Sequence, residues 1–264
     1  MKASLRLLLA AALSASICGC AYPPQGREVI MQTSTIGALL EGAYDGDMTF
    51  GELRRYGDFG IGTVNRLDGE MIALDGEFYQ VRADGKAYRI GDSAKTPFAV
   101  VTFFEPDMTV VLARALDYEQ LQESLDRALP TGNVPYAIRI DGTFSFVKTR
   151  SVPAQTKPYP RLVEVVKTQP TFEFHDVRGT MVGVRLPSYM EGVNAVGYHL
   201  HFITEDRRAG GHLLECVTAE VTVGIDETPG FLVLLPEGEG FDKIELTGPG
   251  SDEVRQVEHD DSGR

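Results

Sequence analysis

The chain contains no tryptophan and only three cysteines among its 264 residues. Cys18 and Cys20 lie near the start, where signal processing would remove the first and modify the second, and this leaves Cys216 without a partner. A disulfide scaffold is therefore excluded. The fold must depend on its hydrophobic core, for which a hydrophobic content of 43% is ordinary.

Positive charge is also scarce. The sequence has 25 Lys and Arg residues against 38 Asp and Glu residues, so its formal net charge is −13. Nucleic-acid binding needs a basic surface, and we therefore expect no nucleic-acid partner. An anionic substrate would have to meet local positive charge, because the overall field repels it.

The apolar run near the start is too short to span a bilayer, which takes about 20 residues. The run extends from Leu7 to Ala15, and Lys2 and Arg6 precede it. This order is typical of an export signal. We predict a signal peptide over residues 1–19 and a linker over residues 20–33.

The apolar run ends in Ile17-Cys18-Gly19-Cys20. A small residue followed by cysteine is the pattern at which lipoprotein signals are cut and lipidated. We expect an exported periplasmic or cell-envelope lipoprotein anchored at Cys20. Ordinary cleavage nearby would leave a soluble exported protein, and a misread leader would leave the protein in the cytoplasm.

The rest of the chain shows short strands, tight turns and few helices. Asp-Gly pairs at 68–69, 75–76 and 84–85 separate short apolar runs, which predicts a β-meander. Helices are predicted over Thr35–Ala43, from a capping box at Thr49–Glu52, over Asp117–Leu129 and, in the tail, at 252–257. Further strands are predicted at 98–104, 136–140, 144–148, 161–167, 179–186, 195–203, 212–223 and 231–235.

These elements indicate a sheet-rich α+β fold of two closely packed β-rich subdomains with a few short helices. We place an N-terminal mixed β-sheet subdomain at residues 34–150. A C-terminal β subdomain, which carries the metal site and the tail, occupies residues 151–264.

Three of the five histidines lie within a stretch of fourteen residues. Side chains alternate along a strand, so His199 and His201 lie on one face while Leu200 and Phe202 lie on the other. If 195–203 and 212–223 pair antiparallel, His212 lies beside the first two. Three imidazoles with an open position suit a catalytic zinc ion, although manganese and iron also accept histidine, and the histidines could be ordinary packed residues.

Several long strings resemble the α-acetolactate decarboxylase family. They are GYHLHF at 197–202 with GGH at 210–212, TSTIGALLEGAYDGDMTFGEL at 33–53, GDFGIGTVNRLDGEMIALDGEFYQ at 57–80, KTPFAVVTFF at 95–104 and YAIRIDGTFSFVKTRSVP at 136–153. The resemblance covers nearly all of residues 31–235. It implies zinc-dependent decarboxylation of (S)-2-acetolactate to (R)-acetoin, a homodimer, and two β-rich subdomains with the metal in the second.

The resemblance also assigns roles to individual residues. It implies zinc ligands at His199, His201 and His212. Other roles follow from the matching motifs, with Glu70 near the metal, Thr63 lining the substrate pocket and Arg150 as the catalytic arginine. A glutamate from the tail is also expected at the metal, either Glu258 or Glu253.

In the implied reaction the metal chelates the hydroxyl and ketone oxygens of the substrate and stabilises the enediolate left by carbon dioxide. Arg150 positions the anionic substrate, and neither thiamine diphosphate nor pyridoxal phosphate is expected. Two alternatives remain open on the histidines alone. One is a zinc hydrolase, and the other is an exported zinc-binding lipoprotein without turnover.

Overall fold

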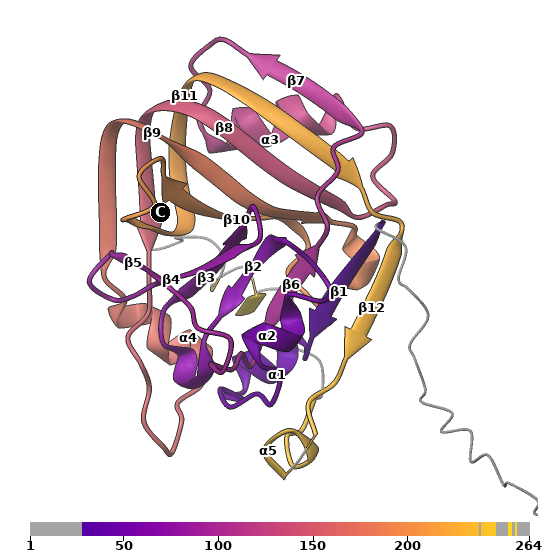
Figure 1. The fold of residues 1–264 in the computed structure, drawn as a ribbon, viewed down its shortest axis with the longest axis vertical. Helices are drawn as coiled ribbons and strands as arrows, with labels where there is room; N and C mark the ends of the chain where they lie inside the picture. Colours follow the sequence, from indigo (N-terminus) through magenta and orange to yellow (C-terminus); the bar gives the residue numbers. More distant parts are fainter. Residues whose placement is uncertain (1–27, 238, 247–252, 255–256, 258–264) are drawn as a thin grey trace, which may run out of the picture.

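The computed structural model describes residues 28–237, 239–246, 253–254 and 257 (Figure 1). The predicted signal peptide and Cys20 lie outside the described residues. The last five residues of the predicted linker form strand β1 (Val29–Thr33), so the linker assignment was wrong there. Ile30 and Met31 are fully buried in this strand, and a run of only five residues gave too weak a strand signal in sequence.

One sheet has seven strands. Its order is β12 (Gly230–Leu234), β1, β6 (Ala99–Thr102), β2 (Phe59–Thr63), β3 (Glu70–Leu74), β4 (Glu77–Val81) and β5 (Ala87–Arg89). β1 and β12 run parallel, and the other neighbours pair antiparallel. The Asp-Gly turns at 68–69 and 75–76 connect β2, β3 and β4, which confirms the predicted meander.

The second sheet has five strands. Its order is β10 (Gly197–Thr204), β9 (Thr171–Leu186), β8 (Tyr136–Arg150), β11 (Gly210–Glu227) and β7 (Met108–Leu112), and β10 also pairs with β11. The strands predicted at 136–140 and 144–148 form the single strand β8. Asp141 and Gly142, between the two predicted strands, do not break β8, because both residues pair with β9 on one side and β11 on the other.

Helices are short and few in the described residues. They are α1 (Ile36–Leu40), α2 (Phe50–Leu53), α3 (Tyr118–Asp126), α4 (Leu162–Val165) and α5 (Glu239–Asp242). The capping box of Thr49 and Glu52 is present, and α3 begins at the predicted Asp117 cap. No helix in the described part of the chain is long and apolar enough to cross a membrane.

The strand predicted at 161–167 was wrong. This segment forms α4 followed by a 3-10 turn over Val166–Thr168. Leu162, Val163 and Val165 are all buried. In so short an apolar run, the spacing of hydrophobic residues does not distinguish a strand from a helix.

The two sheets pack against one another through a shared apolar cluster (Figure 1). Phe59, Ile61 and Ile72 of the seven-stranded sheet meet Val182 and Ile203 of the five-stranded sheet in this cluster. The fold is therefore sheet-rich α+β, as predicted. The predicted boundary at residue 150 does not separate the two sheets, because β7 and β8 precede it while β12 returns to the seven-stranded sheet.

Candidate metal centre

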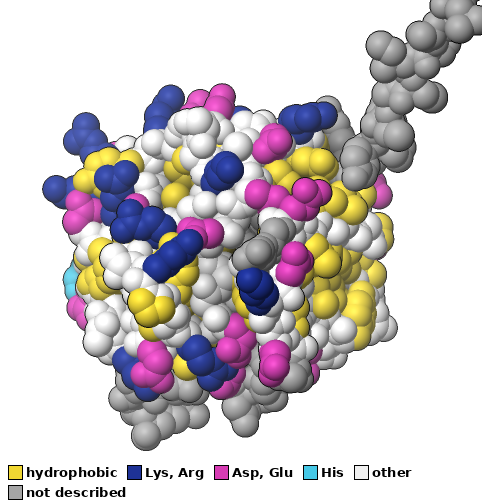
Figure 2. Space-filling model, turned by 90° about the horizontal axis from the view of Figure 1, so that it is seen from below, with side chains coloured by type: hydrophobic (Ala, Val, Ile, Leu, Met, Phe, Trp, Pro, Cys, Tyr) yellow, Lys and Arg dark blue, Asp and Glu magenta, His cyan; other side chains and the backbone are white. Residues whose placement is uncertain are grey.

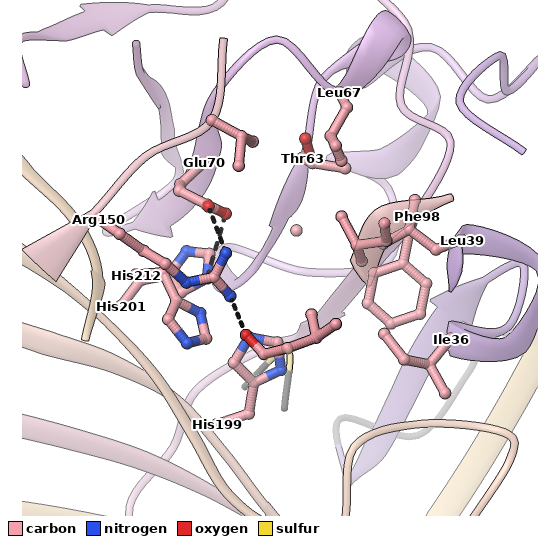
Figure 3. Close-up of a pocket in the computed structure, with 14 residues that line it drawn as sticks. Ile36, Leu39, Thr63, Leu67, Glu70, Phe98, Arg150, His199, His201 and His212 are labelled. Atoms are coloured by element: carbon pink, nitrogen blue, oxygen red, sulfur yellow. Dashed lines mark hydrogen bonds and ion pairs between the residues drawn. The ribbon is translucent and has the colours of Figure 1, made fainter. Parts of the chain in front are cut away.

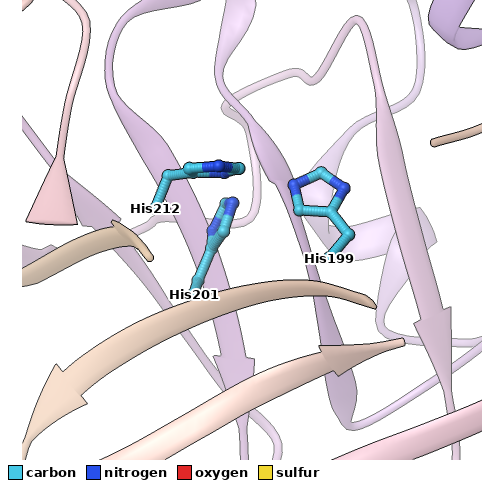
Figure 4. A group of neighbouring side chains, drawn as sticks. All are labelled: His199, His201 and His212. Atoms are coloured by element: carbon cyan, nitrogen blue, oxygen red, sulfur yellow. The ribbon is translucent and has the colours of Figure 1, made fainter. Parts of the chain in front are cut away.

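The three histidines converge because of strand register. His199 and His201 lie two residues apart on β10, and His201 is the direct partner of His212 on β11. Their ring centroids are 5.0–5.3 Å apart, and one ligand atom from each ring lies within 4.8 Å of the others (Figure 4). Leu200 and Phe202 lie in the core cluster on the opposite face, as the alternation predicts.

A glycine allows β11 to approach β8 just before His212. Gly211 has φ +140°, and an added Cβ there would lie 2.3 Å from the carbonyl oxygen of Arg150. His212 and Arg150 are themselves register partners across β11 and β8. The GGH string therefore carries a packing requirement as well as a metal ligand.

All three histidines are buried, with exposed fractions of 1–7%. Burial lowers the pKa of His201 well below its ordinary value, and the neighbouring His199 and the positive charge of Arg150 lower it further. His201 Nδ1 lies 2.9 Å from the carbonyl oxygen of Met71. Because that carbonyl can only accept, Nδ1 donates and Nε2 keeps its lone pair, which is the form that binds a metal.

Glu70 reaches the histidines from the other sheet. It is the first residue of β3 and only 7% exposed. One carboxylate oxygen lies 3.7 Å from His201 Nε2, and the other lies 3.9 Å from an Arg150 guanidinium nitrogen. Glu70 therefore lies beside the histidine cluster, whose three ring nitrogens are the ligand atoms that lie within 4.8 Å of one another.

Arg150 ends β8 and is only 4% exposed. Its Nη1 donates to Gln169 Oε1 at 2.9 Å, and its Nη2 donates to the carbonyl oxygen of Val257 at 2.7 Å. Sequence reasoning missed both partners. Gln169 follows a segment wrongly predicted as a strand, and a carbonyl oxygen of the tail leaves no signal in sequence.

Thr63 ends β2 and lines the same cavity. Its hydroxyl donates to the carbonyl oxygen of Gly69 at 2.6 Å, which fixes the rotamer and leaves the oxygen lone pairs available. The structure thus brings Thr63, Glu70 and Arg150 together with the three histidines around one cavity.

The cavity has a volume of about 40 Å³ and two chemically different sides. Figure 3 shows the three histidines, Glu70 and Arg150 on one side, across from apolar side chains. The apolar residues that line the cavity are Ile36, Leu39, Leu67, Phe98, Val152, Leu162 and Val257. Such a site suits a small ligand with a charged or chelating end and an apolar end.

Of the two tail glutamates, Glu258 lies outside the described residues. Glu253 is described, and its carboxylate accepts from Arg161 at 3.2 and 3.0 Å. It is not among the residues that line the cavity. The structure therefore places Glu253 in an ion pair and does not bring it to the histidines.

On the face drawn in Figure 2, acidic and basic side chains lie interspersed among hydrophobic and uncharged ones.

Comparison with known proteins extends the match beyond the site. The family model for alpha-acetolactate decarboxylase matches residues 30–248. The alpha-acetolactate decarboxylase of Methylococcus capsulatus is 48% identical over 240 residues, covering 90% of this chain and 92% of that protein. That of Bacillus subtilis is 47% identical over 220 residues, covering 83% of this chain and 86% of that protein.

Solved structures agree in fold. The crystal structure of the alpha-acetolactate decarboxylase of Bacillus subtilis superposes with a TM-score of 0.86 at 45% identity, covering 88% of this chain and 99% of that one. A Staphylococcus aureus protein of unknown function, described as similar to alpha-acetolactate decarboxylase, gives a TM-score of 0.82 at 31% identity, covering 87% and 99%. These matches show that the chain belongs to the alpha-acetolactate decarboxylase family.

Proposed function

We propose that this protein decarboxylates (S)-2-acetolactate to (R)-acetoin with a zinc ion held by His199, His201 and His212. One observation carries the proposal. In a chain of this family, three buried imidazoles lie within 4.8 Å of one another, beside a buried arginine and glutamate.

The residues present fit such a metal. The hydrogen bond from His201 to the Met71 carbonyl fixes the ring with its lone pair directed away from that carbonyl, and three histidines leave room for substrate where a closed structural site would add a fourth ligand. Zinc bound there would act as a Lewis acid toward the negative charge that develops on the substrate oxygens as carbon dioxide leaves.

Arg150 supplies the fixed positive charge that an anionic substrate needs in an acidic protein. Its guanidinium is held by Gln169 and Val257, so little reorganisation is required when substrate binds. Arginine stays protonated at any working pH and is a poor proton donor. Arg150 therefore binds and orients the carboxylate and does not deliver the proton.

Glu70 and Thr63 fix the other polar contacts. The Glu70 carboxylate lies between Arg150 and His201, where it can accept a hydrogen bond from the substrate hydroxyl or orient a water molecule. The Thr63 oxygen can accept a further hydrogen bond. The apolar side of the cavity receives the methyl groups. A water molecule oriented by Glu70 would supply the proton that replaces carbon dioxide, and its delivery from one face would account for a single acetoin enantiomer.

The test is release of carbon dioxide and acetoin from racemic acetolactate, before and after chelation and after zinc is restored, with metal analysis of each sample. We expect activity that chelation abolishes and zinc restores. His212→Ala should abolish activity, and the control His175→Ala should not, because His175 is an exposed histidine of β9 with 69% side-chain exposure. Folded, zinc-loaded protein that forms no acetoin would refute the proposal.

The same samples separate the alternatives. A zinc-binding protein would retain metal without turnover, and a zinc hydrolase would cleave an ester substrate offered beside acetolactate. The homodimer and the lipid anchor stay predictions. Light scattering tests the first, and membrane fractionation of Cys20→Ser tests the second, since a protein that stays on the membrane after this change is not anchored there.

A further inference from the structure

Among the C-terminal residues that the structure describes (253–254 and 257), Val257 forms part of the wall of the cavity. Its carbonyl oxygen accepts the hydrogen bond from Arg150 at 2.7 Å. Val254 and Val257 are 7% and 3% exposed and belong to the same apolar cluster as Ile36 and Leu162. Tail placement therefore affects both the apolar wall and the orientation of Arg150.

One arginine ties this segment to two other elements. The guanidinium of Arg161 donates two hydrogen bonds to the carboxylate of Glu41, through Nε and Nη2, and two to that of Glu253, through Nη1 and Nη2. Glu41 caps the C-terminal end of α1, and Arg161 itself precedes α4. The planar fork of arginine suits two bidentate carboxylates at once, which lysine cannot match.

Each of the three tied elements contributes to the apolar side of the cavity. α1 supplies Ile36 and Leu39, α4 supplies Leu162, and the tail supplies Val257. Without the guanidinium the carboxylates of Glu41 and Glu253 would face one another as like charges. Arg161 therefore joins the three segments whose relative positions define this side of the cavity.

We propose that Arg161 is a positioning residue, which pairs with Glu41 and Glu253 together and so holds the tail in the position where Val257 lines the cavity and accepts the hydrogen bond from Arg150. The inference rests on the proposed function. Arg161 does not touch the substrate, and its contribution reaches the reaction through the tail.

Kinetics provide the main test. Arg161→Ala and Glu253→Gln should each lower kcat/KM for acetolactate by about three- to tenfold, the size expected for one partly exposed charge network, with zinc content unchanged. In the double variant kcat/KM should fall no further than in the less active of the two single variants, because both changes break the same contact. Arg161→Lys should recover part of the loss.

A matched control exists on β9. Arg178 pairs with Glu205 at 3.2 Å, with side-chain exposures of 64% and 67%, and neither residue lines the cavity. Arg178→Ala should leave kcat/KM unchanged. Additive losses in the double variant, or wild-type kcat/KM in Arg161→Ala, would overturn the proposal.

Limited proteolysis followed by mass spectrometry reports tail placement without reference to activity. Arg161→Ala should be cut within the C-terminal segment several-fold faster than wild type and Arg178→Ala, and equal cutting rates would overturn the proposal. If the wild-type protein forms no acetoin but Arg161→Ala is still cut faster within the C-terminal segment, the proposed reaction is wrong while the proposed contact between Arg161 and the tail is supported.

Discussion

Asp226 should make the protein less stable as the pH rises. It is only 2% exposed, near the end of β11, and one of its oxygens accepts from the backbone N–H of Glu105 at 3.0 Å. Burial raises the pKa of Asp226 from 3.8 to about 7, and the negative charges of Asp107, Glu28 and Asp58 add to the shift. Ionised Asp226 is therefore an uncompensated buried charge.

The direction of this pH dependence follows from the linkage between proton binding and folding. An acid whose pKa is raised by folding binds its proton more tightly in the folded state, so this stabilisation is full below about pH 4 and is lost as the pH rises through about 7. A shift of about three pKa units corresponds to about 4 kcal/mol. With some relaxation around the charge, we expect a destabilisation of about 2–4 kcal/mol at pH 8.

Asp226→Asn isolates this effect, because it keeps the shape and an oxygen acceptor for Glu105 but removes the charge. In urea unfolding at pH 8 the variant should be more stable than wild type by about 2–4 kcal/mol, and at pH 4.5 the difference should fall below about 1 kcal/mol. Asp206→Asn is the control, since Asp206 is exposed and its pKa is lowered. If the difference in the free energy of unfolding between wild type and Asp226→Asn does not change with pH, the reasoning is refuted.

Two further predictions concern hydrogen bonding by the buried side chains of Arg150 and Tyr44. Gln169→Ala removes the acceptor at 2.9 Å from Arg150 Nη1, so kcat/KM should fall about tenfold with zinc content retained, as steady-state kinetics and metal analysis would show. An unchanged kcat/KM would mean that Val257 alone holds the guanidinium. Tyr44→Phe should leave the free energy of unfolding unchanged or raise it by up to about 1 kcal/mol, because the Tyr44 hydroxyl is buried without a hydrogen-bond partner among the described residues. Urea unfolding measures this, and a loss above about 1 kcal/mol would reveal a missing partner.

The metal cluster could be predicted because it depends on local rules. His199 and His201 lie on one face by strand alternation, and the Gly-rich turn before His212 indicated an antiparallel return that the register confirms. Glu70 and Arg150 had no such local pattern. They come from other strands, so only the family resemblance pointed to them.

Other features depend on contacts that no local pattern encodes. The short run at 161–167 is apolar in either a strand or a helix, and its packing against α1 and the tail decides for helix. Gln169 and Val257 contact Arg150 from positions 19 and 107 residues away. Glu253 was considered as a metal ligand, but its carboxylate accepts hydrogen bonds from Arg161. Arg161 also pairs with Glu41, which lies 120 residues before Arg161 in the chain.

Arg150, which lines the cavity, and Arg161, which does not, differ in how their charges are paired. Arg161 faces two carboxylates, so its charge is neutralised and it serves to hold segments together. Arg150 donates instead to a side-chain amide oxygen and a backbone carbonyl, which orient the guanidinium but carry no net charge, and the Glu70 carboxylate stays 3.9 Å away. The guanidinium of Arg150 is thus fixed in place by uncharged hydrogen-bond partners and forms a longer ion pair with Glu70. In the proposed function, this guanidinium supplies the local attraction for an anionic substrate in a chain whose net charge is −13.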